Sequence, residues 1–195
     1  MRWVTRVDST NTALKALARG GAPDGLCLCA DEQTAGRGQY GRSWHSPAGQ
    51  GLYLSILRRT APATADVACV TTFAGLMVHR ALTEFVGDST RLSLKRPNDV
   101  FLDGGKVAGV LVEAEWQRGA LEFLIIGIGV NVGQVSFPDG LRHPATSLRL
   151  ALGDAAPTRE AVLHSLLDNI QTHWEAFIAA PVEFVADHSR NVVFH

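Results

Sequence analysis

The stretch Leu124-Ile125-Ile126-Gly127-Ile128-Gly129-Val130 decides how this chain folds. Successive residues of an extended chain point to opposite sides, and here both sides are apolar, so we expect a strand in the middle of a sheet. Its glycines, Gly127 and Gly129, indicate that a ligand or another part of the backbone approaches closely. The strand should run over residues 120–132, with the rest of the sheet on both sides of it.

The segments around this strand carry the signals of a hairpin-rich sheet. Turn residues at 103–105 and 117–119 frame a return strand over residues 106–116. Further strands are expected at residues 2–7, 26–30, 51–57, 92–94 and 100–102, with one more within 181–195. Helices are expected at residues 12–19 after the capping residues 8–11, at 66–86, just after 144–148, and after a cap at Thr158.

This order of segments predicts an α+β fold. Hairpins and meanders without regular βαβ alternation favour a mixed, largely antiparallel sheet with helices packed on one face. Apolar residues recur at helical spacing over residues 66–86, so we interpret Phe73 and Met77 as core residues rather than a cofactor site. Cys27 and Cys29 alternate in a strand and should be buried packing residues rather than metal ligands.

Length and charge narrow the class of protein. The 195 residues suit one domain with a proper core. A formal net charge of −1 gives no general attraction to nucleic acid or to an acidic membrane. The sequence has neither an apolar run long enough to span a bilayer nor the apolar core of a signal peptide at its start, which predicts a cytoplasmic protein.

The stretch Gly36-Arg37-Gly38-Gln39-Tyr40-Gly41-Arg42-Ser43-Trp44 is unlike any core strand. Glycine lets a ligand approach the main chain, and arginine offers planar charged donors that suit carboxylates and phosphates. Strands expected on both sides would anchor this loop. We interpret it as a flap that closes over an anionic ligand; the alternative is a flexible surface loop with solvated charges.

Other polar groups lie at the ends of expected strands. Pro97-Asn98-Asp99, Lys106 and Asn131 each have a plain structural reading, as a turn, an edge lysine and a strand-ending residue. The run Ser9-Thr10-Asn11 would suit simple helix capping as well as ligand binding. Each structural reading alone is at least as good as a functional one. Their occurrence together with the flap favours a binding site.

With these elements in this order, the chain resembles the catalytic domain of biotin–protein ligases over nearly its whole length. Six sequence elements of the family match, in order. Residues 8–11 match its Ser-Thr-Asn element, residues 33–44 its Gly-Arg-Gly flap and residues 95–100 its Lys-Trp-Pro-Asn-Asp turn. Residues 106–113 match its Lys-x-x-Gly-Ile-Leu-x-Glu strand, residues 127–132 its Gly-Ile-Gly-Ile-Asn strand and residues 145–148 its Ala-x-Ser-Leu element. The resemblance implies a fold shared with class II aminoacyl-tRNA synthetases and lipoate ligases.

The resemblance also implies a reaction in two steps. Biotin and ATP give biotinyl-5'-AMP and pyrophosphate, with Mg²⁺ at the phosphates. A lysine on the biotin carboxyl carrier protein of acetyl-CoA carboxylase or a related carboxylase then takes the biotin. A homodimer through an exposed sheet edge is common in the family, and such an edge could pair two copies here.

Roles carry over to matching positions. Those implied for catalysis are Arg37, Lys106 and Asp99, with Asp99 also positioning Mg²⁺. Those implied for biotin binding are Ser9, Thr10, Asn11, Gln33, Gly36, Arg37, Lys106, Gly109 and Leu111. Those implied for ATP and the adenylate are Arg37, Gln39, Arg42, Trp44, Asn98 and Asn131.

The chain departs from the family in several places. Arg96 replaces a tryptophan and should change the local packing, and Gln39 replaces a second flap arginine and should loosen the closed flap. We expect residues 1–180 to form the catalytic domain and residues 181–195 a stub, with the family's small C-terminal domain absent or truncated. With no helix-turn-helix before Met1, no DNA binding is expected.

Two other functions compete with this interpretation. One is a lipoate-ligase-like acyl transferase, which would need a different flap motif. The other is a module that binds biotin or its adenylate with weak or no transfer, in keeping with Gln39 and the expected lack of a C-terminal domain. A DNA-binding regulator is disfavoured because the sequence offers no basic face or reading helix.

Overall fold

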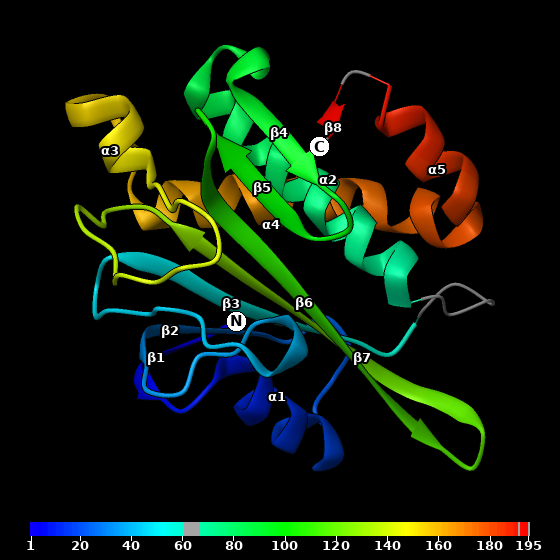
Figure 1. The fold of residues 1–195 in the computed structure, drawn as a ribbon. Helices are drawn as coiled ribbons and strands as arrows, with labels where there is room; N and C mark the ends of the chain where they lie inside the picture. Colours follow the sequence, from blue (N-terminus) through cyan, green and yellow to red (C-terminus); the bar gives the residue numbers. More distant parts are fainter. Residues whose placement is uncertain (61–66, 191, 195) are drawn as a thin grey trace.

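The computed structural model describes residues 1–60, 67–190 and 192–194. These residues form one eight-stranded sheet in the order β1-β2-β3-β7-β6-β5-β4-β8 (Figure 1). The strands are β1 (Arg2–Val7), β2 (Cys27–Gln33), β3 (Gly51–Arg58), β4 (Leu92–Lys95), β5 (Asp99–Leu102), β6 (Gly105–Gln117), β7 (Ala120–Asn131) and β8 (Val193–Phe194).

The pairing confirms the mixed, largely antiparallel sheet. β1 pairs with β2 and β4 with β8 in parallel, and the remaining neighbours are antiparallel. β7 lies between β3 and β6, as its apolar faces predicted. The turns before and after β6 place Asp103, Gly104, Arg118 and Gly119 at positive φ, which gives tight hairpins on both sides of that strand.

Helices cover both faces of the sheet, so the expectation of helices on one face was wrong. The α-helices are α1 (Thr10–Arg19), α2 (Val67–Val86), α3 (Leu148–Leu152), α4 (Arg159–Ala179) and α5 (Pro181–His188), with short 3₁₀ helices at Gln39–Gly41, Ser89–Arg91 and Gly153–Ala155. α2 and α4 lie on one side of the sheet and α1 on the other (Figure 1). None of the described helices combines the length and apolarity needed to cross a membrane.

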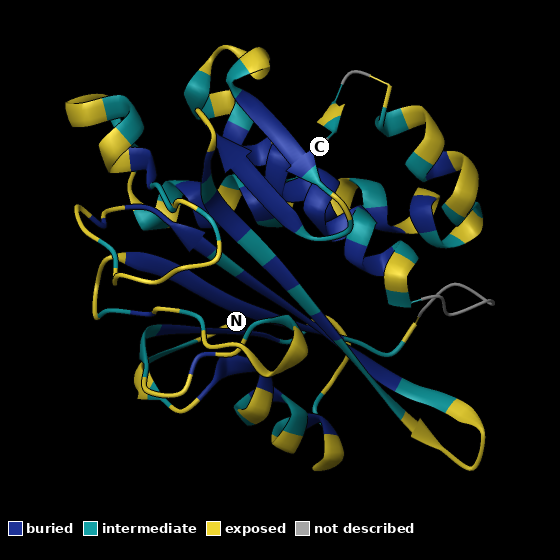
Figure 2. Ribbon diagram, in the orientation of Figure 1, coloured by how far each residue is buried: buried dark blue, intermediate teal, exposed yellow. Residues whose placement is uncertain are grey.

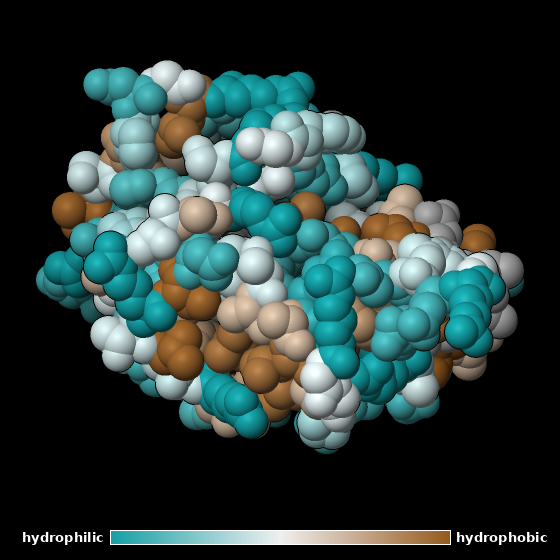
Figure 3. All heavy atoms as spheres, turned by 90° about the horizontal axis from the view of Figure 1, so that it is seen from below, coloured by the Kyte–Doolittle hydropathy of each residue, from teal (hydrophilic) through white to brown (hydrophobic). Residues whose placement is uncertain are grey.

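Alternation along the strands explains the second helical layer. Leu14 and Ala18 of α1 pack on Leu28, Phe123 and Ile125, which point away from α2. Cys27 and Cys29 point the other way, into the main core as predicted, where burial raises the pKa of Cys29 to about 12. Viewed from the side of α1, some apolar side chains are visible among mostly hydrophilic ones (Figure 3), although Leu28, Phe123 and Ile125 beneath the helix are buried.

The main core lies between the sheet and α2, α4 and α5. Buried residues follow the sheet strands and the inner side of α2 (Figure 2), and Phe73 and Met77 are fully buried as expected. The predicted start of α2 at residue 66 lies outside the described residues. Thr158 caps α4 by accepting a hydrogen bond from the Ala161 amide, which confirms the predicted cap.

The stretch 181–188 is a helix, where the sequence analysis expected only a strand within 181–195. Pro181 opens α5, a position at which proline is tolerated because the first amides of a helix have no partner. Phe184 is buried against Phe177. His188, one helical turn later, stacks on Phe184 with ring centroids 3.8 Å apart. A strand does follow, as β8, and α5 shares the core of the preceding residues.

Truncating the aromatic centre of this core should destabilise the whole fold. Phe177 is fully buried and stacks on Phe73 with centroids 4.3 Å apart. We expect Phe177→Ala to lower the free energy of unfolding by about 3–5 kcal/mol, because the lost burial adds to the cost of a cavity. Urea denaturation measures this, with the exposed Leu150→Ala as a control expected to stay within about 0.5 kcal/mol. A loss for Phe177→Ala no larger than for the control would contradict the packing.

Candidate functional site

A pocket of about 410 Å³ opens where β6 and β7 meet the start of α1, the flap and the turn between β4 and β5. Every predicted site residue except Gly36 lines it. Gly36 lies under the flap, where an added Cβ would come within 2.6 Å of the Trp44 carbonyl oxygen and 2.7 Å of Ser46 Oγ. Only glycine fits this contact, so Gly36 shapes the base of the flap.

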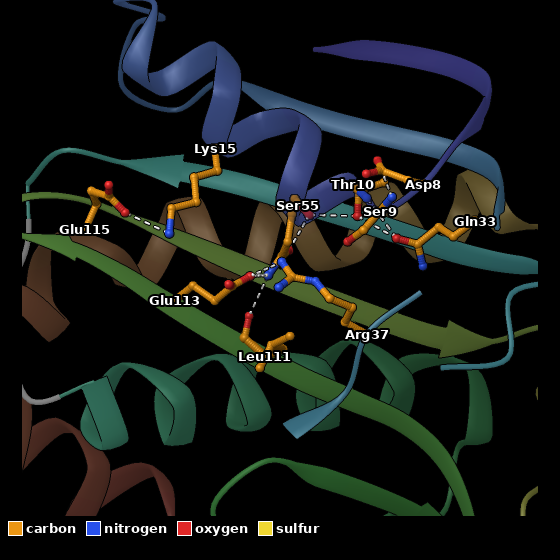
Figure 4. A network of polar contacts seen from close by, with 11 residues as sticks. Asp8, Ser9, Thr10, Lys15, Gln33, Arg37, Ser55, Leu111, Glu113 and Glu115 are labelled. Carbon is orange, nitrogen blue, oxygen red and sulfur yellow. Dashed lines mark hydrogen bonds and ion pairs between the residues drawn. The ribbon is translucent and has the colours of Figure 1, made fainter. Parts of the chain in front are cut away.

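The start of α1 forms a polar wall of the pocket. Ser9 is the N-cap residue but makes no side-chain capping bond, so simple capping does not account for this segment. Gln33 Oε1 accepts hydrogen bonds from the backbone amide and the hydroxyl of Thr10, at 2.9 and 3.1 Å (Figure 4). Gln33 Nε2 donates to Ser46 Oγ at 2.9 Å. Gln33 thereby joins the helix to the end of the flap.

Gly127 makes room for Asn11. An added Cβ on Gly127 would lie 2.2 Å from Asn11 Oδ1, so the close approach predicted from this glycine is made by a side chain rather than by backbone. Asn11 Oδ1 accepts a hydrogen bond from the buried Ser55 hydroxyl at 2.6 Å. Asn11 Nδ2 donates to the Leu111 carbonyl at 3.3 Å and to Glu113 Oε2 at 2.8 Å.

The flap is a short hydrogen-bonded hairpin. Arg37 and Ser43 form an antiparallel bridge, and the Trp44 amide donates to the Gly36 carbonyl at 2.8 Å. Tyr40, with φ 59°, and Gly41, with φ 73°, turn the chain at the tip, and the Tyr40 side chain is exposed. The guanidinium of Arg37, which lines the pocket, pairs with Glu113 Oε2 at 2.7 Å (Figure 4).

Trp44 reaches from the flap to the floor of the pocket. Its ring lies over two glycines: an added Cβ would meet it at 2.5 Å on Gly129 and at 3.0 Å on Gly109. The indole Nε1 is buried, and no partner for it lies among the described residues. Lys106 Nζ is 5.2 Å from the centre of the ring, a cation–π distance. Gly109 and Gly129 therefore serve to admit an aromatic ring.

Lys106 and Asp99 form an ion pair at the other end of the pocket. Lys106 Nζ lies 2.7 Å from Asp99 Oδ1, with both side chains mostly buried. Asn98 holds the preceding turn by donating to the Val110 carbonyl at 3.0 Å. Among the described lining residues Asp99 is the only acid, whereas the Lys and Arg residues are Arg37, Arg42, Lys95, Arg96, Lys106 and Arg142. The lining of the pocket is therefore strongly cationic, and Lys95, Arg96 and Lys106 lie at the end formed by β6 and the turn between β4 and β5.

Asn131 fastens the loop that follows β7. Its Nδ2 donates to the Lys106 and Thr146 carbonyls at 3.3 and 3.0 Å, and its Oδ1 accepts from Gln134 at 3.3 Å. The side-chain amide thus holds residues 132–147 against β6. Contact of Asn131 with a ligand would require some of these bonds to be exchanged.

Among the lining residues that were not predicted as site residues from the sequence, five come from this loop: Phe137, Leu141, Arg142, His143 and Ala145. Lys95 Nζ lies 3.3 Å from His143 Nε2, and burial together with the nearby Lys95 charge lowers the pKa of His143. The neutral imidazole can then accept a hydrogen bond from the lysine. The sequence signal for these residues is weak, because residues 137–145 hold one arginine, Arg142, and have no apolar periodicity.

Arg96 stands where the family has a tryptophan, and its side chain stacks on the C-terminal segment. Its guanidinium carbon lies 4.3 Å from the centre of the Phe194 ring. Phe194 belongs to β8, which pairs with β4 next to this turn. Among the described residues no group of three or more His, Cys, Asp or Glu side chains could hold a metal ion by itself.

Comparisons with known proteins agree with this geometry. The model of the Biotin/lipoate A/B protein ligase family matches residues 3–131. The chain is 36% identical over 188 residues to Biotin--[acetyl-CoA-carboxylase] ligase of Mycobacterium tuberculosis (strain ATCC 25618 / H37Rv), covering 95% of this chain and 68% of that protein. It is 36% identical over 163 residues to Bifunctional ligase/repressor BirA of Bacillus subtilis (strain 168), covering 83% of this chain.

This chain spans about half the length of the Bacillus relative, 50%. A solved structure of the biotin protein ligase from Aquifex aeolicus, in complex with biotin and ATP, superposes with a TM-score of 0.77 at 36% identity, covering 92% of this chain and 72% of that one. The fold is therefore that of the biotin protein ligases, as the resemblance implied. The family model matches about two thirds of this chain's residues, and the relatives agree with it. The chain therefore belongs to the biotin/lipoate A/B protein ligase family.

Proposed function

We propose that the chain activates biotin with ATP to give biotinyl-5'-AMP and transfers the biotin to a lysine of a carrier protein. The observation that carries this proposal is one pocket that joins a neutral wall of amides and hydroxyls to a cationic end. Biotin has the same division, since a polar ureido ring and a carboxylate lie at opposite ends of the molecule. The names of the relatives, which refer to biotin ligases, support the choice of biotin.

The neutral wall suits the ring of biotin. A ureido group offers one carbonyl acceptor and two N–H donors. Ser9, Thr10, Asn11 and Gln33 supply hydroxyls and amides of both kinds at this end of the pocket. The aliphatic part of the ligand would pack on Leu111 and over Gly109, with Gly36 keeping the base of the flap close.

The cationic end suits the reacting anions. A biotin carboxylate oxygen attacks the α-phosphorus of ATP, the bond to the bridging oxygen breaks, and pyrophosphate leaves. The biotin carboxylate and the ATP phosphates are both anions and repel each other. Positioned cations lower this repulsion in a site of low dielectric. We assign Lys106 and Arg37 to the carboxylate and the α-phosphate, and Arg42 to the remaining phosphates. The lysine amine of the carrier then attacks the acyl carbon, AMP leaves, and the nitrogen loses a proton.

We assign Asp99, with Asn98, to a metal ion bound together with the nucleotide. Mg²⁺ in nucleotide sites takes one or two carboxylates and completes its coordination with phosphates and water, so a single carboxylate in the pocket fits this requirement. Bound there, Mg²⁺ would neutralise phosphate charge. Asp99 would then exchange its contact with Lys106 for the metal, which frees the lysine for the ligand.

The adenine would lie near Trp44 and Asn131, both of which line the pocket. Trp44 is carried by the flap, so its ring can change position when the flap moves. Gln39 stands at the start of the flap's 3₁₀ turn, where it can donate a hydrogen bond but adds no charge. Closure over the adenylate would exclude water, which otherwise hydrolyses a mixed anhydride.

The proposed acceptor is the biotin carboxyl carrier protein of acetyl-CoA carboxylase or a related carboxylase, and the proposed location is the cytoplasm, where ATP and that acceptor are found. The proposal includes residues 1–180 as the catalytic domain. It also includes pairing of two copies through a sheet edge, for which β1 (Arg2–Val7) offers the longer edge strand.

The test is a two-stage assay with the full chain. Pyrophosphate release on adding biotin and ATP reports the first step, and a mass increase on a purified carrier domain reports the second. Saturable biotin binding without pyrophosphate release would show a binding module instead. Turnover with lipoate or octanoate but not with biotin would show an acyl transferase of the other branch of the family.

Removing the Lys106 amine should stop the first step. We expect Lys106→Ala to lower pyrophosphate release by roughly a hundredfold or more, because a positioned cation at the reacting anions is lost. Lys15→Ala is the matched control, since Lys15 pairs with Glu115 of β6 and does not line the pocket, and it should keep the rate of the unaltered chain. Unchanged pyrophosphate release by Lys106→Ala would show that the assignment of this lysine is wrong.

Restoring a flap charge should slow the loss of the intermediate. We expect Gln39→Arg to release biotinyl-5'-AMP roughly two- to fivefold more slowly, the size of effect that one partly exposed ion pair gives. Release is followed by rapid filtration after a single turnover without acceptor. Gln39→Met, which is of similar size but uncharged, should show no slowing. An unchanged rate for the arginine variant would count against a role for charge at this position.

A further inference from the structure

A carboxylate to which the sequence analysis gave no role ties the flap to the sheet. Glu113 Oε2 lies 2.7 Å from a terminal nitrogen of Arg37 (Figure 4). The same oxygen lies 2.8 Å from Asn11 Nδ2. A single oxygen atom thus connects the flap with the start of α1. Asn11 is itself fixed by Ser55 and by the Leu111 carbonyl, so the acceptor stands on a rigid base.

The position of Glu113 along β6 keeps Arg37 away from Lys106. Residues 109, 111 and 113 point to the same face of the strand because side chains alternate. Lys106 Nζ is beside the first of these, 3.3 Å from where a Cβ on Gly109 would be. Glu113 is four residues further on, so its backbone lies roughly 13 Å along the strand from that of Gly109. Pairing with Glu113 therefore holds Arg37 further along β6 than Lys106, toward the start of α1.

We propose that Glu113 is a positioning residue that holds Arg37 in the ligand-free protein and gives it up to the carboxylate of biotin. This inference rests on the proposed function, because it takes that carboxylate to be the ligand of Arg37. The two side chains are 43% and 22% exposed, so their pairing is weak enough to be exchanged. The Glu113 carboxylate then competes with biotin for Arg37. The apparent affinity for biotin falls in proportion to the fraction of molecules in which Arg37 is paired with Glu113.

Glu115 provides a matched comparison on the same strand. It points to the same face two residues later and pairs with Lys15 at 2.7 Å and Arg19 at 2.6 Å, both on α1 (Figure 4 shows the Lys15 pair). No described contact joins it to the flap. Glu115 thus fastens the helix alone, whereas Glu113 fastens the helix and the flap.

The experiment compares biotin with biotin amide, whose carboxylate is replaced by a neutral group, in calorimetric titrations without ATP. In Glu113→Gln the amide oxygen can still accept from Asn11, but the charge that attracts Arg37 is gone. We expect biotin to bind roughly two- to fivefold more tightly to this variant than to the unaltered chain. Biotin amide should bind equally to both, and Glu115→Gln should change neither affinity.

A second variant and a second measurement separate competition from a structural effect. In an Arg37→Gln background the Glu113→Gln change should no longer alter the affinity for biotin. Without ligand, amide hydrogen exchange over residues 36–44 should be faster in Glu113→Gln than in Glu115→Gln.

Weaker binding of biotin by Glu113→Gln, no change, or the same change for biotin amide would overturn this inference while leaving the proposed function in place. Failure of the unaltered chain to bind biotin at all would overturn the proposed function and this inference together.

Discussion

The absence of side chains on two residues of the central strand makes the pocket. Gly127 leaves the space that the Asn11 amide fills, and Gly129 leaves the space that the Trp44 ring fills. Any Cβ at either position would collide with these groups. The start of α1 and the flap can therefore both contact the same face of this central strand, which is paired with β3 on one edge and β6 on the other.

Around this strand two of the cations that line the pocket are paired with acids. Lys106 rests on Asp99 and Arg37 on Glu113, each at 2.7 Å. The acids come from different strands, β5 and β6, so the two pairs are independent of each other. A site built for anions would otherwise hold unpaired cations in partly buried positions, which costs free energy through desolvation. Each pair is also a contact that an anionic ligand can exchange.

Much of this arrangement could be predicted from the sequence. The apolar run at 124–130, the turn residues around β6 and the helical stripe of α2 are local signals, and each gave the right element. The second helical layer could not be predicted, because the alternation of β2 and β7 does not say which face α1 covers. The helix at 181–188 was missed since its stability comes from Phe184 in an aromatic cluster formed by distant residues. Ser55, Glu113 and the loop 132–147 also could not be assigned to the site from the sequence, because only the fold brings these distant segments together.

The placement of the aromatic residues has one practical consequence. Of the four tryptophans, Trp174 is enclosed in the core, the Trp3 indole donates to Asp31, and Trp116 is exposed near the β6–β7 turn. Trp44 alone lines the pocket, with a lysine ammonium over its ring and an indole N–H without a partner among the described residues. Its fluorescence is therefore a built-in optical signal of pocket occupancy, readable without any attached dye.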